Sequence, residues 1–142
     1  MKNILRFISL VLATVFLVSC RAGSYKDGVY SSRQAEFDSE SGWKDIIQIT
    51  VLNGKITAVD WNSVHRDGGN DKKTQSKSGE YNMPAEKQWH EQAKLMEEAL
   101  IREQNPDNLR INTSGLVDGV SGVTIHVSSF VPLAKDALKN AK

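Results

Sequence analysis

The sequence predicts an α+β domain in which an antiparallel sheet is packed by two helices. Three observations lead to this fold class. Two runs of alternating apolar and polar residues are joined by Asn-Gly, a long segment places apolar residues at helical spacing, and a second such segment closes the chain. Runs of period 2 indicate strands with one buried face, whereas spacings of three and four residues indicate an amphipathic helix.

The central hairpin is predicted over about residues 44–62. Apolar residues alternate from Ile47 to Val51, Asn53-Gly54 follows, and residues 55–61 alternate again. Asn-Gly favours a two-residue type I′ turn, because both central residues of that turn need a positive φ. A further strand is expected near residues 25–30, where aromatic and β-branched residues gather.

Two helices are predicted, over about residues 84–104 and 128–140. The first has Pro84 in its first turn and carries an apolar stripe formed by Trp89, Ala93, Met96 and Leu100. The second begins near Ser128 or Ser129, either of which is a plausible N-cap. Residues 62–81 are rich in Gly, Asp, Asn, Ser and Lys without periodicity, so a long surface loop is expected there.

The N-terminus divides the chain into a signal peptide (1–19), a lipidated tether (20–24) and one domain (25–142). Lys2 and Arg6 precede a short apolar run that ends in Leu-Val-Ser-Cys. This ending resembles the lipobox of bacterial lipoproteins, which implies that Cys20 becomes the N-terminus and carries acyl chains such as palmitate. The alternative is an ordinary signal peptide with a Cys near its cleavage point. Cys20 is the sole Cys, so no disulfide within the chain is available.

Charge and motif spacing exclude several classes of function. The formal charge is +1 for the whole chain and −1 once Lys2 and Arg6 are removed. The chain therefore lacks the excess of positive charge that is typical of nucleic-acid-binding proteins. The three histidines lack the spacing of a metal site, and no Ser-His-Asp order or paired acidic site stands out. Hydrolysis therefore has little support.

Residues 118–124 concentrate small and polar residues just before the last helix. The segment contains Asp118, Gly119, Ser121, Gly122, Val123 and Thr124. Glycines allow the backbone to approach a ligand closely, and free N–H groups near a helix start attract phosphate. On spacing alone, a plain turn with an N-cap is the alternative.

The segment resembles one found in the FMN-binding domains of sodium-pumping NADH:quinone reductase, of Rnf-type complexes and of related lipoproteins. There, Asp-Gly-x-Ser/Thr-Gly/Ser-Ala-Thr/Ser is recognised by a flavin transferase, which moves FMN from FAD onto the final hydroxyl. The resemblance implies that Thr124 is the acceptor, and it extends to the strand pair and Gln88-Trp89-His90. Val123 departs from the family form, which has Ala at this position, and its two extra methyl groups beside the acceptor can crowd the transferase or the bound flavin. FMN bound non-covalently at the same turn is therefore the second option.

The implied function is a membrane-anchored electron carrier, rather than an enzyme, that faces the periplasm or the cell exterior. Tyr81 and Met83 are candidates for a lid over the flavin ring. The implied partners are a flavin transferase and membrane redox proteins, and the short tether favours partners near the membrane surface. The alternative is a lipoprotein of the same fold without covalent flavin, acting as a binding module or surface antigen.

Overall fold

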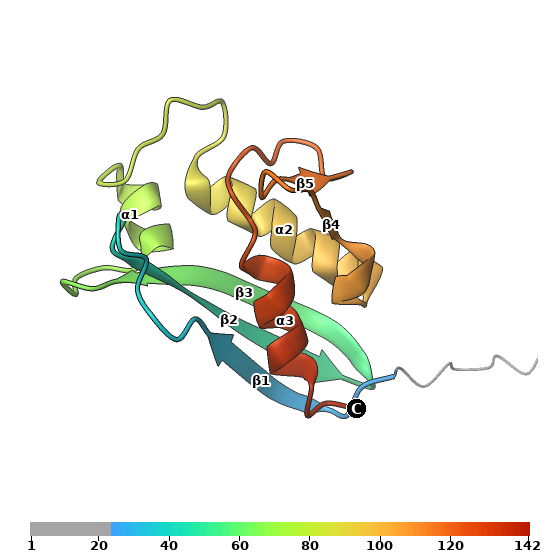
Figure 1. The fold of residues 1–142 in the computed structure, drawn as a ribbon. Helices are drawn as coiled ribbons and strands as arrows, with labels where there is room; N and C mark the ends of the chain where they lie inside the picture. The colour runs from blue at the N-terminus through green and yellow to red at the C-terminus, as the bar shows by residue number, and fades with distance from the viewer. Residues whose placement is uncertain (1–23) are drawn as a thin grey trace, which may run out of the picture.

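A computed structural model describes residues 24–142; the expected signal peptide and Cys20 lie outside this range. The main sheet contains β1 (Gly28–Arg33), β2 (Trp43–Leu52) and β3 (Lys55–His65), in the order β1-β2-β3 with antiparallel pairing throughout. Helices lie over one of its faces (Figure 1). The predicted α+β class is confirmed.

The predicted hairpin is confirmed and is slightly longer than expected. Its turn consists of Asn53 and Gly54, with φ of 52° and 72°, as a type I′ turn requires. On β2, Ile47, Ile49 and Val51 face the core and are at most 2% exposed. Strand alternation therefore gives the sheet one buried and one open face.

The core lies between the sheet and two helices, α2 (Trp89–Glu103) and α3 (Phe130–Leu138). α2 packs on β3, whereas α3 packs on β1 and β2. The predicted stripe on α2 is buried: Trp89 is 4% exposed, and Ala93, Met96 and Leu100 are fully buried. The spacing of these residues thus identified the correct helix and the correct face.

The expected start of the first long helix, at Pro84, was wrong: α2 begins at Trp89. Gln88 occupies the N-cap position, where its N–H donates to Glu91 Oε2 at 2.8 Å. Its side chain reaches back to Met83, accepting from the N–H at 2.9 Å and donating to the carbonyl at 3.1 Å. These bonds hold residues 83–88 as a loop, although Pro84 would suit a first helical turn.

The expectation of an irregular loop over residues 62–81 was also wrong. β3 continues to His65, and a short helix α1 spans Lys72–Ser78. Asp71 caps its start by accepting from the Thr74 N–H at 3.0 Å, and Gly79 ends it with φ of 85°. α1 was missed because it has no apolar stripe and rests on its two caps and polar contacts.

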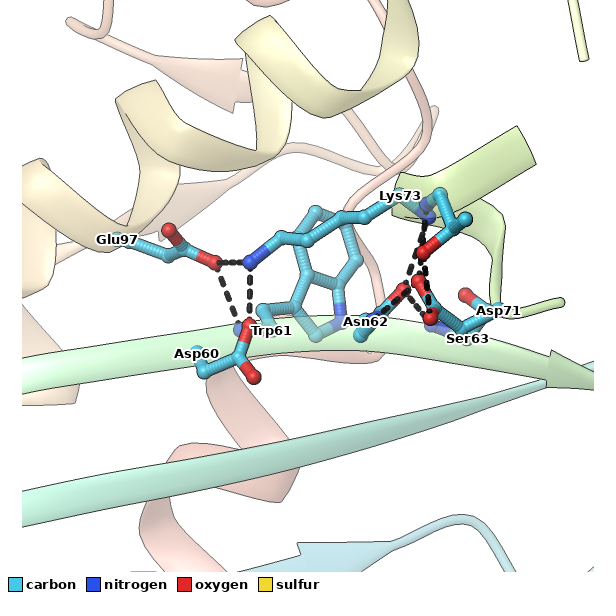
Figure 2. A network of polar contacts seen from close by, with 8 residues as sticks. Asp60, Trp61, Asn62, Ser63, Asp71, Lys73 and Glu97 are labelled. Carbon is cyan, nitrogen blue, oxygen red and sulfur yellow. Dashed lines mark hydrogen bonds and ion pairs between the residues drawn. The ribbon is translucent and has the colours of Figure 1, made fainter. Parts of the chain in front are cut away.

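Lys73 joins α1 to α2 and β3. Its ammonium group pairs with Glu97 of α2 and Asp60 of β3, and Glu97 Oε1 also accepts the Trp61 N–H at 2.7 Å (Figure 2). Burial alone would lower the pKa of Lys73, but the two carboxylates outweigh it and hold the pKa above its ordinary value. Lys73 therefore stays charged and fixes α1 over the end of the sheet.

The remaining elements follow α2 in the chain. A 3-10 turn η1 (Pro106–Asn108) precedes a two-stranded sheet of β4 (Arg110–Ile111) and β5 (Val117–Asp118). The closing helix starts two residues later than predicted. Ser129 precedes α3 but makes no capping bond, because its hydroxyl bonds to Asp45 on β2 instead.

Both ends of the described chain lie at the hairpin tip (Figure 1). The Tyr25 N–H donates to the Gly54 carbonyl at 3.3 Å, and the Lys26 N–H donates to the Ala141 carbonyl at 2.6 Å. Within residues 24–142 there is no helix long and apolar enough to cross a bilayer.

Candidate functional site

The predicted acceptor segment is an exposed loop between β5 and α3. Asp118 ends β5, and Gly119 and Gly122 adopt φ of 81° and 83°, values that favour glycine. Ser121 and Thr124 are both exposed. The loop therefore presents two hydroxyl groups to solvent.

Residues 123–127 alternate between the core and the surface. Val123, Ile125 and Val127 are at most 8% exposed, whereas Thr124 and His126 face outward. The side chain of Val123 is thus part of the core, whereas that of Thr124 faces solvent. The alternating Val-Thr-Ile-His-Val pattern was visible in the sequence but was not used.

Gln92 of α2 fixes the position of Thr124. This side chain is 1% exposed, and its Oε1 accepts the N–H groups of Thr124 and Ile125 at 2.7 and 3.1 Å. The Thr124 hydroxyl lies 3.3 Å from the same oxygen, and Gln92 Nε2 donates to the Lys87 carbonyl at 2.8 Å. The sequence analysis missed Gln92, although an amide on the apolar stripe, three residues after Trp89, was the available signal.

Thr124 lines a pocket of about 590 Å³ at the end of the sheet where β2 begins. Tyr81 and Met83 line the same pocket, so three of the predicted site residues meet there. The full lining is Asp38, Ser41, Lys72, Tyr81, Met83, Pro84, Ala85, Trp89, Thr124, Ile125 and His126. The structure therefore joins residues that lie more than forty positions apart in the sequence.

The aromatic side chains of the pocket are held by the elements around them. Tyr81 donates its N–H to the Gln75 carbonyl at 3.0 Å, and its ring meets Trp43 edge-on at 6.1 Å between centroids. Trp43 is half-buried, because it stands at the first position of β2, beside the pocket.

Lys72 of α1 brings a positive charge into this aromatic wall. Its ammonium nitrogen lies 4.6 Å from the ring centroid of Tyr81 and 5.1 Å from those of Trp43 and Trp89. Each ring face attracts a cation at such a distance. Burial lowers the pKa of Lys72, and the Asp45 carboxylate opposes that shift. Lys72 was not predicted, because it lies in the segment expected to be a loop.

Thr124 also borders a smaller hollow, of about 250 Å³, on its other side. Lys87, Gln92 and Gly122 line it, together with Ala85 and Glu86. A Cβ added at Gly122 would lie 3.1 Å from Lys87 Cε, so the glycine lets this lysine side chain pass close to the loop. Thr124 thus borders both the aromatic pocket and a hollow that contains one lysine and one glutamate.

Not every predicted residue joins the site. Asp118, Gly119 and Ser121 are exposed and line neither hollow, and Val123 belongs to the core. Another hollow, of about 550 Å³, lies between α1 and α2 and contains none of the predicted residues.

Comparison with known proteins links the chain to bacterial proteins of similar size. No protein-family model matches the sequence. The chain is 29% identical over 136 residues to a "15 kDa lipoprotein" of Treponema pallidum (strain Nichols), with 90% of this chain and 84% of that protein covered. The chain is thus similar to a lipoprotein, which supports association with a membrane.

Two solved structures share the fold. A crystal structure of a Clostridium perfringens protein is 29% identical, with a TM-score of 0.64 over 82% of this chain and 88% of that one. A solution NMR structure of a Clostridium thermocellum protein is 46% identical, with a TM-score of 0.63, and the match covers 81% of this chain and 91% of that one. With this identity over nearly the whole solved domain, the chain belongs to the same family as the Clostridium thermocellum protein.

Proposed function

We propose that this chain is a membrane-anchored lipoprotein that carries electrons outside the cytoplasm, using FMN attached through a phosphoester to Thr124. The observation that carries the proposal is the position of Thr124. Its exposed side chain borders the pocket that also contains Tyr81 and Met83, and Gln92 fixes its backbone.

The larger pocket suits a flat aromatic ring. Its volume of about 590 Å³ lies within the range of cofactor sites, and Tyr81, Met83 and Trp89 supply apolar and aromatic walls. Lys72 adds one cation to this wall. A positive charge beside a flavin stabilises the extra electron density of its reduced form.

The smaller hollow suits the phosphate end. Lys87 supplies a positive charge there, next to the carboxylate of Glu86, and the absence of a side chain at Gly122 leaves room for the Lys87 side chain. Lysine ammonium groups are common partners of phosphate oxygens. With Thr124 between the two hollows, a phosphoester at its hydroxyl would direct the phosphate toward Lys87 and the ring toward Tyr81.

The base needed for the modification is assigned to a separate flavin transferase. Among the described residues, the Thr124 hydroxyl has the amide of Gln92 as its hydrogen-bond partner, and an amide does not accept a proton near neutral pH. A transferase would provide the base and a metal-bound FAD. In such a transfer the Thr124 oxygen would bond to the FMN phosphorus, the pyrophosphate bond would break with AMP as the leaving group, and the base of the transferase would take the hydroxyl proton.

FMN would supply reversible two-electron chemistry, while the protein supplies position and electrostatics. Lys72 carries charge, Gln92 fixes the acceptor loop, and Gln88 holds Met83 at the rim of the pocket. An acylated Cys20 would keep the carrier at the membrane, consistent with the similarity to a lipoprotein.

The test is co-expression of the domain with a flavin transferase, followed by intact-mass measurement. The wild-type protein should gain the mass of FMN minus water. Thr124→Ala should abolish the gain, whereas Ser121→Ala, which removes a neighbouring exposed hydroxyl, should leave it unchanged. Yellow colour that is lost on denaturation would indicate non-covalent FMN. An unmodified, colourless protein would refute the proposal in favour of a binding or surface-antigen module.

A further inference from the structure

The end of the domain next to the tether exposes apolar side chains and lysines. This tether pole consists of residues 25–29, the hairpin tip 52–55 and the C-terminal residues 141–142, which are joined by the backbone bonds from Tyr25 to Gly54 and from Lys26 to Ala141. Cys20 precedes Ser24 by four residues, which span at most about 14 Å when extended. An acyl chain on Cys20 therefore keeps the tether pole close to the lipid surface.

Exposed apolar side chains gather at this pole. Among the described residues, three large hydrophobic side chains are exposed, and two of them are Val29 (61%) and Leu52 (56%). Both lie on the open face of the sheet, since Val29 pairs with Thr50, and Thr50 and Leu52 share one face of β2. Neither side chain is covered by a helix.

Lysines surround these apolar side chains. Lys26, Lys55 and Lys142 are exposed and form no ion pair within residues 24–142. The opposing carboxylate is Asp27, which accepts the Gly54 N–H at 2.8 Å. Lys139 at this end is already paired with Asp136. The tether pole thus combines apolar tips with a modest excess of positive charge.

The candidate pocket lies at the opposite end of the sheet. β2 runs from Trp43, beside the pocket, to Leu52 at the tether pole. Ten residues of extended strand cover about 30 Å. Figure 1 shows the same arrangement, with α1 at the end of the sheet remote from both ends of the described chain.

We propose that the tether pole docks on anionic lipid headgroups and holds the domain upright, with the candidate pocket about 30 Å from the bilayer surface. Leu52 and Val29 enter the interfacial region, and the lysines contact the headgroups. The proposal depends on a lipid at Cys20 but not on flavin. This orientation limits which redox partners can reach the pocket. A partner must itself extend from the membrane or move freely in the aqueous compartment. A molecule dissolved in the bilayer does not reach the docked pocket.

The test compares lipid contact at the two ends of the domain. The full chain is purified with its acyl chains, verified by intact mass, in vesicles of phosphatidylcholine and phosphatidylglycerol that contain a headgroup nitroxide. Single cysteines are introduced as Thr57→Cys near the tether pole and Asn82→Cys at the pocket, both at exposed positions, and are labelled with a fluorophore. Acylated Cys20 does not react with the label. Quenching should be several-fold stronger at residue 57 than at residue 82, and equal quenching would overturn the upright orientation.

A second experiment tests the role of the lysines with a matched pair of double variants. Lys26→Glu/Lys55→Glu reverses two charges at the tether pole, whereas Lys77→Glu/Lys94→Glu makes the same change on α1 and α2. One lysine at an anionic surface strengthens binding roughly fivefold. The equilibrium constant for docking should therefore fall by more than about tenfold in the pole variant. The contrast between residues 57 and 82 should then collapse for the pole variant alone. A contrast that survives in the pole variant would overturn docking by headgroup charge.

Discussion

The position of the Thr124 hydroxyl, the proposed acceptor, depends on Gln92, so Gln92→Met should both destabilise the domain and release the loop. Methionine keeps approximately the volume of glutamine but accepts neither N–H. The Ile125 N–H is buried and would lose its partner, at a cost of about 1–3 kcal/mol. Thr124 and the carbonyl of Lys87 would each lose a bond but lie nearer to solvent. We expect a total loss of about 2–4 kcal/mol.

Two measurements check this prediction. Urea unfolding should give a lower midpoint with an unchanged slope, and amide hydrogen exchange should accelerate at residues 124 and 125. The matched control is Lys94→Met, which changes a largely exposed side chain of the same helix and should alter the unfolding free energy by less than about 0.5 kcal/mol. A Gln92→Met protein that unfolds like the control, with both amides still protected, would refute the assigned role of Gln92.

Three further predictions concern the charges and the core around the site. Lys73→Met should cost about 3–5 kcal/mol near neutral pH, because it leaves Glu97 buried without its cation; the deficit should shrink as the pH falls and Glu97 is protonated. Lys72→Met should lower the reduction potential of the flavin-loaded protein by roughly 30 mV, or ~1.4 kcal/mol for two electrons. Val123→Ala should cost about 1–2 kcal/mol in urea unfolding while leaving flavin attachment at Thr124 unchanged.

The two lysine predictions have control variants, and the Val123 prediction has an outcome that would contradict it. Adding Glu97→Gln to Lys73→Met should recover much of the loss and flatten its dependence on pH. Lys77→Met removes an exposed cation from the same helix as Lys72 and should leave the potential unchanged. Attachment that improves in Val123→Ala would show that the side chain does crowd the acceptor.

The lowered pKa of Lys72 predicts that the unfolding free energy depends on pH. Its pKa is lowered by burial, so between the folded-state and unfolded-state pKa values the unfolded chain binds more protons. The contribution of Lys72 to the unfolding free energy should therefore rise with pH through that interval. The unfolding free energy of the wild-type protein, relative to that of Lys72→Met, should increase as the pH rises toward the ordinary pKa of lysine, and a difference that stays constant with pH would contradict this.

The parts of the fold that could be predicted are those governed by periodicity and turn chemistry. Asn53-Gly54 fixed the hairpin because few other residue pairs tolerate two positive φ values, and Trp89 to Leu100 fixed the buried face of α2. α1 escaped prediction because its order comes from Asp71, Gly79 and tertiary contacts of its lysines. Helix propensity and apolar spacing carry no information about such contacts.

The candidate site was predicted in part. The motif and its place before the last helix pointed to Thr124, and position in the chain pointed to Tyr81 and Met83; the structure brings all three to one pocket. Lys72 and Gln92 were not found. Their roles depend on which side chains approach from other elements, which a single sequence does not specify.

The most direct test of the central claim is fragmentation mass spectrometry of the flavin-loaded protein. Trypsin cleavage after Arg110 and Lys135 releases residues 111–135, which contain Ser121 and Thr124. We predict that the added mass, that of FMN minus water, first occurs in the N-terminal fragment that includes Thr124. A modification that is already present in the fragment ending at residue 123, or a peptide without added mass, would contradict the account.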